Sequence, residues 1–323
     1  MSSIETERDS TSPTVRITHA LPNPDGRPSI TYDGSFKDLP PGVTQRRTGR
    51  SAPFDIELHD GRELDAPLSL SKNGVLFVEN FEPAVDLQGN GLDSQEIVDR
   101  YYPQMSALVC NALGRASIEQ AVVFDHTIRS LARRKRGEKE TNGENVGGYA
   151  NGAHNDNSSG SAKTRVRLLS QPKAAGGSVT LAEPPLSEAD AERIANGRFG
   201  IFNVWRHFRT DYPVEDYPLA LLDAASANTE DFQVAKYVYP HRVGEVMNVL
   251  HQASHRWIYF SQMQYQEALI FKVFDNAAEL GLAPRSDCPP HTAHTSFELP
   301  NTRADTPPRE SIECRVLVEF ASH

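Results

Sequence analysis

The segment Phe199-Gly-Ile-Phe-Asn-Val-Trp205 is a short run of apolar, β-branched and aromatic residues, which is typical of a buried strand. Several other segments have the same character and are separated by turn-forming residues. They are residues 54–58, 75–78 and 120–127, Phe232-Gln-Val-Ala-Lys-Tyr-Val-Tyr239, Trp257-Ile-Tyr-Phe260, Ala268-Leu-Ile-Phe-Lys-Val-Phe274 and Ile312-Glu-Cys-Arg-Val-Leu-Val-Glu-Phe320. The sequence therefore predicts many short strands, most of them in the C-terminal part of the chain.

Two amphipathic helices accompany these strands. The first begins at Asp93, an N-cap residue followed by Glu96, and its apolar residues recur at helical spacing until Gly114. The second begins after Ser187 and stops at Gly197. Many short strands with a few helices favour a mainly β fold with supporting helices, of the jelly-roll type, over a doubly wound parallel sheet.

The chain has 323 residues, which suits one large domain. Residues 1–50 are rich in Pro, Ser, Thr, Asp and Arg and predict a poorly ordered N-terminal arm. Residues 51–323 are then a single domain. Within it, the polar stretch 134–152 is typical of a long flexible loop.

Composition narrows the class of partner. The formal net charge is −10, and the basic run Arg133–Arg136 is too short to track a nucleic-acid backbone. No stretch approaches the roughly eighteen apolar residues of a membrane span, and the acidic N-terminus has no secretory signal, so we expect a cytoplasmic protein without membrane contact. Three cysteines without paired spacing predict no disulfide framework. A small-molecule substrate is the expected partner, and homo-oligomerisation stays open.

The segment Gly152-Ala-His-Asn-Asp156 carries the first candidate metal ligands. Residues two apart on an extended segment project from the same face, so His154 and Asp156 can bind one ion together. A second imidazole would complete a facial triad, the ligand set that leaves positions open for a co-substrate and dioxygen on iron(II). His-X-Asp alone is a weak signal, because it also occurs in ordinary polar loops.

The C-terminal part offers the remaining ligand types. His291 and His294 both precede the final strand, and His255 precedes an earlier one. At the head of the final strand, Arg309 and Ser311 lie two residues apart, so a guanidinium and a hydroxyl share one face. A guanidinium matches the geometry of a carboxylate, which suits the far end of a 2-oxo dicarboxylic acid.

Other polar residues have weaker functional signals. Arg206 ends an apolar strand and can hold a substrate carboxylate or pair with Asp223. Asp125 and His126 are ligand types, but adjacent strand residues point to opposite faces, so we interpret them as structural polar contacts.

Taken together, the chain from about Ile56 to Phe320 resembles the iron/2-oxoglutarate hydroxylase/desaturase family of fungal and bacterial secondary metabolism. The blocks that carry the resemblance are Asp60-Gly-Arg62, Phe124-Asp-His-Thr-Ile-Arg129, His154-Asn-Asp156, Asn203-Val-Trp-Arg206, Tyr217-Pro-Leu-Ala-Leu-Leu-Asp223, His255-Arg-Trp257, Glu267-Ala-Leu-Ile-Phe-Lys-Val-Phe-Asp275, His294-Thr-Ser-Phe297 and Arg309-Glu-Ser-Ile-Glu-Cys-Arg315.

The resemblance implies a double-stranded β-helix of the cupin-like, jelly-roll type, with Fe(II), 2-oxoglutarate and dioxygen as its reagents. It implies His154, Asp156 and His294 as iron ligands and Arg309, supported by Ser311, as the anchor of 2-oxoglutarate. His294 is also favoured over His291 because the Thr-Ser-Phe that follows it can continue a strand. Relatives hydroxylate, desaturate or close rings, so the reaction on the substrate stays open.

Two other functions remain compatible with the residues. A cupin-type metal hydrolase or isomerase would use the same three ligands with water in the open position. A non-catalytic binding module on a degenerate β-helix would predict a damaged triad. Conversion of 2-oxoglutarate to succinate separates the oxygenase from both.

Overall fold

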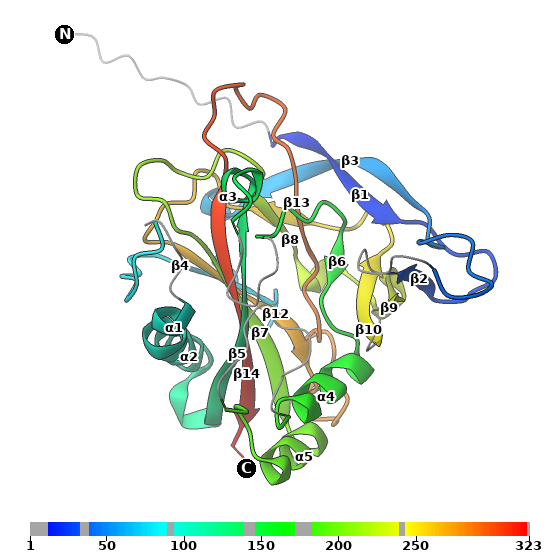
Figure 1. Ribbon diagram of the computed structural model, residues 1–323, viewed down its shortest axis with the longest axis vertical. Helices are drawn as coiled ribbons and strands as arrows, with labels where there is room; N and C mark the ends of the chain where they lie inside the picture. Colours follow the sequence, from blue (N-terminus) through cyan, green and yellow to red (C-terminus); the bar gives the residue numbers. More distant parts are fainter. Residues whose placement is uncertain are drawn as a thin grey trace.

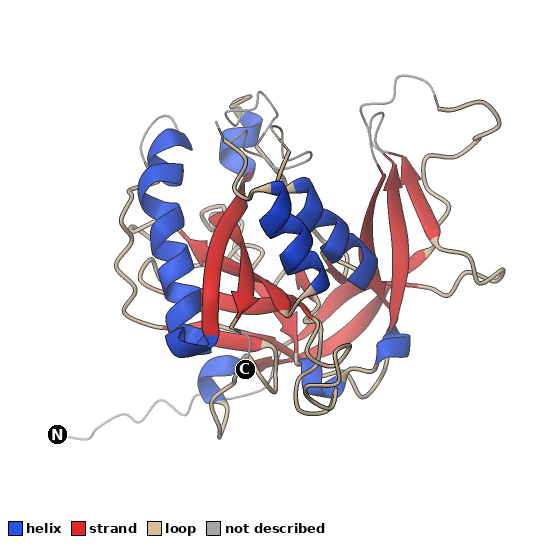
Figure 2. Ribbon diagram, turned by 90° about the horizontal axis from the view of Figure 1, so that it is seen from below, coloured by secondary structure: helices blue, strands red, loops and turns tan. Residues whose placement is uncertain are grey.

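The computed structural model describes residues 12–32, 39–88, 94–138, 146–171, 183–238 and 243–321. Their strands form two sheets, drawn in Figure 1 and Figure 2. In spatial order, the nine-stranded sheet contains β1 (Thr14–Ala20), β3 (Ser51–Asp60), β11 (Trp257–Tyr259), β8 (Leu219–Leu222), β13 (His294–Ser296), β6 (His154–Asn155), β10 (Val243–Val249), β9 (Phe232–Val238) and β2 (Ser29–Tyr32). The five-stranded sheet contains β4 (Val75–Val78), β12 (Ala268–Asp275), β7 (Phe199–His207), β14 (Glu310–Phe320) and β5 (Ile118–Ser130).

The helices lie on the outside of this β-structure. They are α1 (Ser94–Glu96), which continues through a π-helical turn at Ile97–Tyr101 into α2 (Tyr102–Leu113), and then α3 (Leu131–Lys135), α4 (Ser159–Leu168) and α5 (Glu188–Asn196). Helix α2 packs on β5 and β14, while α4 and α5 pack on each other below them in Figure 1. The helices predicted around residues 93–113 and 187–197 are therefore confirmed.

Strand β7 shows how the five-stranded sheet is buried on both faces. Ile201 and Trp205 belong to an apolar core shared with residues of the nine-stranded sheet, such as Leu221. Phe202 and Val204 point the other way, into a second core completed by residues of α2. Because both faces are covered, β7 has a nearly continuous apolar sequence rather than a polar and apolar alternation.

Strand β14 has charged residues on the face that is directed between the two sheets. Its register with β7 places Arg315 opposite Asn203 and Glu313 opposite Trp205, so Glu313 and Arg315 share the face that is directed between the two sheets. The alternate residues, such as Cys314, are in the core beneath α2. The final strand thus presents its charged side to the space between the sheets and its apolar side to the helix.

The prediction of a poorly ordered arm over residues 1–50 is wrong for the described part of that segment. Strand β1 pairs with β3 over its whole length, and β2 pairs with β9. Val15 and Ile17 of β1 are buried in a third core on the outer side of the nine-stranded sheet. The alternating Thr-Val-Arg-Ile-Thr sequence of this strand was obscured by the polar composition around it.

Helix α4 was also not predicted. Its first residues follow Ser158, whose hydroxyl accepts a hydrogen bond from the Ser161 backbone, while the Ser161 side chain caps the Ser158 backbone in return. A run of Ser and Gly is typical of a loop, but here the reciprocal cap begins a helix. The predicted loop at 134–152 lies partly outside the described residues, and its first residues, up to Lys135, are in α3.

If β1 is part of the folded domain, truncating its buried side chain must destabilise the protein. Ile17 is 1% exposed. Ile17→Ala is expected to lower the free energy of unfolding by about 2–5 kcal/mol, because it leaves a cavity in a packed core. Thr14→Ala, at an exposed position of the same strand, is the matched control and should change it by less than about 0.5 kcal/mol. Urea unfolding measures both, and equal stability of the two variants would contradict this assignment.

Candidate metal centre and its surroundings

The structure brings together the side chains of His154, Asp156 and His294. One donor atom from each lies within 4.8 Å of the other two. Asp156 Oδ1 is 3.5 Å from His154 Nε2 and 3.9 Å from His294 Nε2. Three ligands at about 2.1 Å on one face of an octahedral ion are about 3 Å apart, so this donor set fits a metal once the three side chains move closer together.

Three neighbouring strands hold these ligands in register. His154 is the residue of β6 that pairs with His294 of β13, which in turn pairs with Leu221 of β8. Directly paired residues of antiparallel strands point to the same side, so both imidazoles face the interior. Asp156 follows two residues after His154 and shares its face, as the extended His-X-Asp segment predicts.

The carboxylate of Asp156 is held at its second oxygen. Asn203 Nδ2 donates to Asp156 Oδ2 at 3.0 Å, and Arg315 Nε donates to the same oxygen at 3.3 Å. Both donors come from the five-stranded sheet, whereas Asp156 follows a strand of the other sheet. These two bonds turn Oδ1 toward the imidazoles, which is the orientation that a metal needs.

The hydrogen bond of His154 Nδ1 and the pKa values of His294 and Asp156 also suit a metal. The Gly152 carbonyl lies 2.7 Å from His154 Nδ1 and accepts its proton, so Nε2 is the atom that can coordinate. Burial is the main cause that lowers the pKa of His294 to about 3, and the charges of His154, Arg129 and Arg315 act in the same direction. Burial alone would raise the pKa of Asp156, but Arg315 and the two imidazoles hold it well below its usual range.

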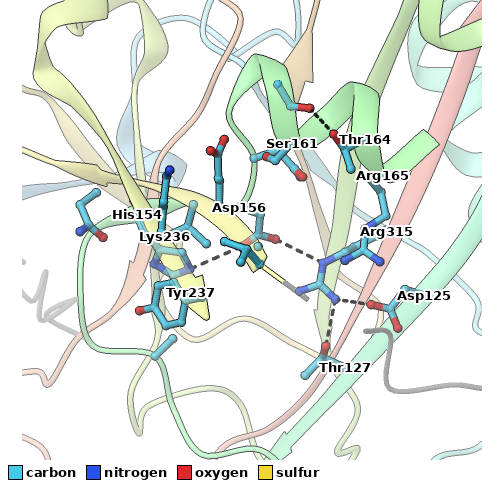
Figure 3. Close-up of a pocket in the computed structure, with 18 of the residues that line it drawn as sticks. Asp125, Thr127, His154, Asp156, Ser161, Thr164, Arg165, Lys236, Tyr237 and Arg315 are labelled. Atoms are coloured by element: carbon cyan, nitrogen blue, oxygen red, sulfur yellow. Dashed lines mark hydrogen bonds and ion pairs between the residues drawn. The ribbon is translucent and has the colours of Figure 1, made fainter. Parts of the chain in front are cut away.

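Arg315 is the centre of a wider ion-pair network, and Figure 3 draws its contacts with Asp156, Asp125 and Thr127. Besides Asp156, its guanidinium contacts Asp125 at 3.0 Å, Glu313 at 3.1 Å and the Thr127 hydroxyl at 3.0 Å. Asp125 is therefore a structural polar contact, as predicted, although it lies next to the candidate ligands. Asn203 and Arg315 were not predicted to contact Asp156; for Asn203 the signal was a polar residue within an apolar run of β7, whereas β14 has several charged residues and did not single out Arg315.

Arg309 and Ser311 lie farther along the same face of the final strand. The Arg309 side chain is buried, donates through Nη1 to the Tyr217 carbonyl and lies over the ring of Tyr149, with its guanidinium carbon 4.3 Å from the ring centre. Ser311 pairs in register with Arg129 of β5. Both predicted anchor residues thus face the interior, toward the same side as the candidate ligands.

Three other candidates are not brought to the cluster. Arg206 points to the opposite face of β7, beneath Tyr101, and donates to the Tyr265 carbonyl, so the expectation that it binds substrate or pairs with Asp223 is not met. His291 Nδ1 lies 3.1 Å from a backbone carbonyl, and His255 contacts Asp231 at 3.1 Å.

A cavity of about 780 Å³ opens beside the cluster. His154, Asp156 and Arg315 contribute to its wall, and the labelled side chains of Figure 3 show Tyr237 on one side of them and Thr164 of α4 on the other. Pockets of this size enclose small organic ligands.

The described helices contain none with the length and hydropathy that a bilayer crossing requires.

Comparison with known proteins identifies the family. A family model described as an oxidoreductase/YMDC permease-like domain matches residues 17–319. The chain belongs to this family.

Curated relatives come from fungi. The aspirochlorine biosynthesis protein N of Aspergillus oryzae is 36% identical over 134 residues, a match that covers 41% of this chain and 52% of that protein. This chain therefore matches about half of that relative's length. The Fe(II)/2-oxoglutarate-dependent dioxygenase nvfI of Aspergillus novofumigatus is 27% identical over 281 residues, covering 86% of this chain and 87% of that protein. Hydroxylase/desaturase asaB of Aspergillus flavus is 29% identical over 168 residues, covering 48% and 70%.

The fold is similar to that of a solved structure. The iron and alpha-ketoglutarate-dependent endoperoxidase NvfI superposes with a TM-score of 0.72 at 22% sequence identity, covering 96% of this chain and 98% of that chain. The chain accordingly has the jelly-roll fold that its sequence predicts, and the resemblance to hydroxylase/desaturase sequences is confirmed by the names of its relatives.

The Asp156 contacts give a direct test of how the candidate centre is built. Asn203→Ala removes one of the two donors to Oδ2 and is expected to weaken Fe(II) binding by about 10- to 100-fold, because partners of a ligating carboxylate fix its orientation. Asn248→Ala is the matched control, since Asn248 lines the same cavity but donates to Ser29. Anaerobic metal titration measures both, and equal affinities would show that Asn203 does not orient Asp156.

Proposed function

We propose that the chain is a non-haem Fe(II)/2-oxoglutarate-dependent oxygenase that acts on a small molecule of secondary metabolism. The observation that carries this proposal is the convergence of His154, Asp156 and His294 on one point between the sheets. Two imidazoles and one carboxylate are the ligand set of such oxygenases and leave half of an octahedron open. Relatives named as 2-oxoglutarate-dependent dioxygenase and hydroxylase/desaturase support the same assignment.

Each group then has a defined task. His154, Asp156 and His294 hold the iron, and Arg309 holds the far carboxylate of 2-oxoglutarate with support from Ser311. When bound, iron and 2-oxoglutarate activate dioxygen for oxidation of a substrate carbon, with release of succinate and carbon dioxide. The cavity beside the cluster orients the substrate, and Asn203 and Arg315 keep the Asp156 carboxylate turned toward the metal. Hydroxylation, desaturation and ring closure all use this arrangement.

Anaerobic reconstitution tests the proposal. Fe(II) with 2-oxoglutarate is expected to give the weak visible charge-transfer band of the chelate, and admission of air is expected to give succinate. Asp156→Ala and His294→Ala should lose the band, because each removes a ligand. His291→Ala is the matched control, since its imidazole lies outside the cluster, and it should retain metal binding. Metal binding without a chelate band would instead favour a metal-dependent hydrolase.

The anchor role of Arg309 predicts a specific loss. Arg309→Leu is expected to raise the apparent dissociation constant for 2-oxoglutarate at least tenfold, because a hydrogen bond between charged groups contributes about 1.5–3 kcal/mol. Titration of the charge-transfer band measures this constant independently of turnover. An unchanged constant, with the protein folded and metal-loaded, would exclude Arg309 as the anchor.

A further inference from the structure

The charged residues between the sheets are unevenly distributed. Three carboxylates, those of Asp125, Asp156 and Glu313, all lie within 3.3 Å of the single guanidinium of Arg315. These three carboxylates therefore share one cation as their ion-pair partner.

Two further guanidiniums face the same space. Arg129 of β5 pairs in register with Ser311, and Arg309 lies two residues before Ser311 on the same side of its strand. Neither guanidinium forms an ion pair with a carboxylate of the described residues. Arg129 instead donates through Nη1 to the Gly148 carbonyl at 2.6 Å, and Arg309 donates to the Tyr217 carbonyl.

One short segment brings these two guanidiniums near each other. Gly148 binds Arg129, and the next residue, Tyr149, covers the Arg309 guanidinium with its ring. The Arg309 side chain is 2% exposed, its Nε has no hydrogen-bond partner, and burial lowers its pKa to about 10. The positive charge of Arg129 also lowers the pKa of Arg309, whereas the carboxylates of Asp216 and Glu313 raise it.

Arg309 is buried, Arg129 is half-buried, and neither guanidinium is ion-paired with a described carboxylate, so an anion that reached both would gain charge-assisted hydrogen bonds from each. We propose that Arg129 and Arg309 form a two-guanidinium cradle for the distal carboxylate of the 2-oxo dicarboxylic acid co-substrate, with Arg129 as the previously unassigned half. This inference rests on the proposed function and extends it, since it makes recognition of the co-substrate depend on two strands, β5 and β14, rather than one.

A comparison of two ligands tests the cradle. Pentanoic acid with a 2-oxo group, 2-oxopentanoate, has the chelating end of 2-oxoglutarate but no distal carboxylate. For Arg129→Met loaded anaerobically with Fe(II), the dissociation constant of 2-oxoglutarate, read from the charge-transfer band, should rise about 10- to 100-fold. The dissociation constant of 2-oxopentanoate should change less than about threefold, because only the distal carboxylate binds the guanidinium. Arg129→Lys should fall between wild type and Arg129→Met, and the exposed Arg16→Met should match wild type.

Two results would overturn the cradle. Wild-type affinity of Arg129→Met for 2-oxoglutarate would show that Arg129 does not bind it, and an equal loss for both acids would show that Arg129 supports the metal site or the fold. If wild type formed no chelate with either acid, the proposed function would fail separately. The cradle would then be tested on metal-free protein by measuring thermal stabilisation by glutarate. Stabilisation of wild type that disappears in Arg129→Met would support the cradle, and no stabilisation of wild type would refute it.

Discussion

The interior of this protein depends on one half-buried guanidinium, that of Arg315, which joins the two sheets at the candidate metal centre. Its three carboxylate partners come from both sheets. Asp156 directly follows β6 of the nine-stranded sheet, whereas Asp125 and Glu313 lie on β5 and β14 of the five-stranded sheet. Without Arg315, three carboxylates would lie close together in a poorly hydrated space, where like charges repel strongly. The contact between Arg315 and Asp156 relieves this repulsion and also turns the Asp156 carboxylate toward the two imidazoles. Arg315 therefore contributes both to the stability of the fold and to the geometry of the site.

Sequence patterns predicted this architecture well where local chemistry and tertiary structure agree. The apolar segments of β7, β12 and β14 are short, β-branched and bounded by turns, and the structure has strands at each. The pairing of His154 with Asp156 needed only the two-residue period of a strand, and the preference for His294 over His291 needed only the position of the following strand residues. In these cases the information lies within a few residues of the site.

The unpredicted features depend on contacts between distant segments. Arg129, Asn203 and Arg315 are polar positions in buried strands, and the alternation of a strand does not reveal which face is inside. On β14 the usual expectation is reversed: the apolar face is covered by α2, and the charged face is directed between the sheets. Arg206 shows the opposite error: its place at the end of an apolar strand suggested substrate binding, yet it points to the face opposite that of Trp205.

The formal charges of this interior explain how it can hold both reagents of the proposed enzyme. Arg129, Arg309 and Arg315 supply three positive charges, and Asp125, Asp156 and Glu313 supply three negative charges. A divalent metal and a dianionic co-substrate carry equal and opposite charges, so binding both adds no net charge to this space. Binding only one of them adds two charges, which a low-dielectric interior penalises. The separation of these charges matters too: the carboxylates gather around Arg315 beside the candidate metal ligands, and the other two guanidiniums lie toward the end at which we propose that the distal carboxylate binds.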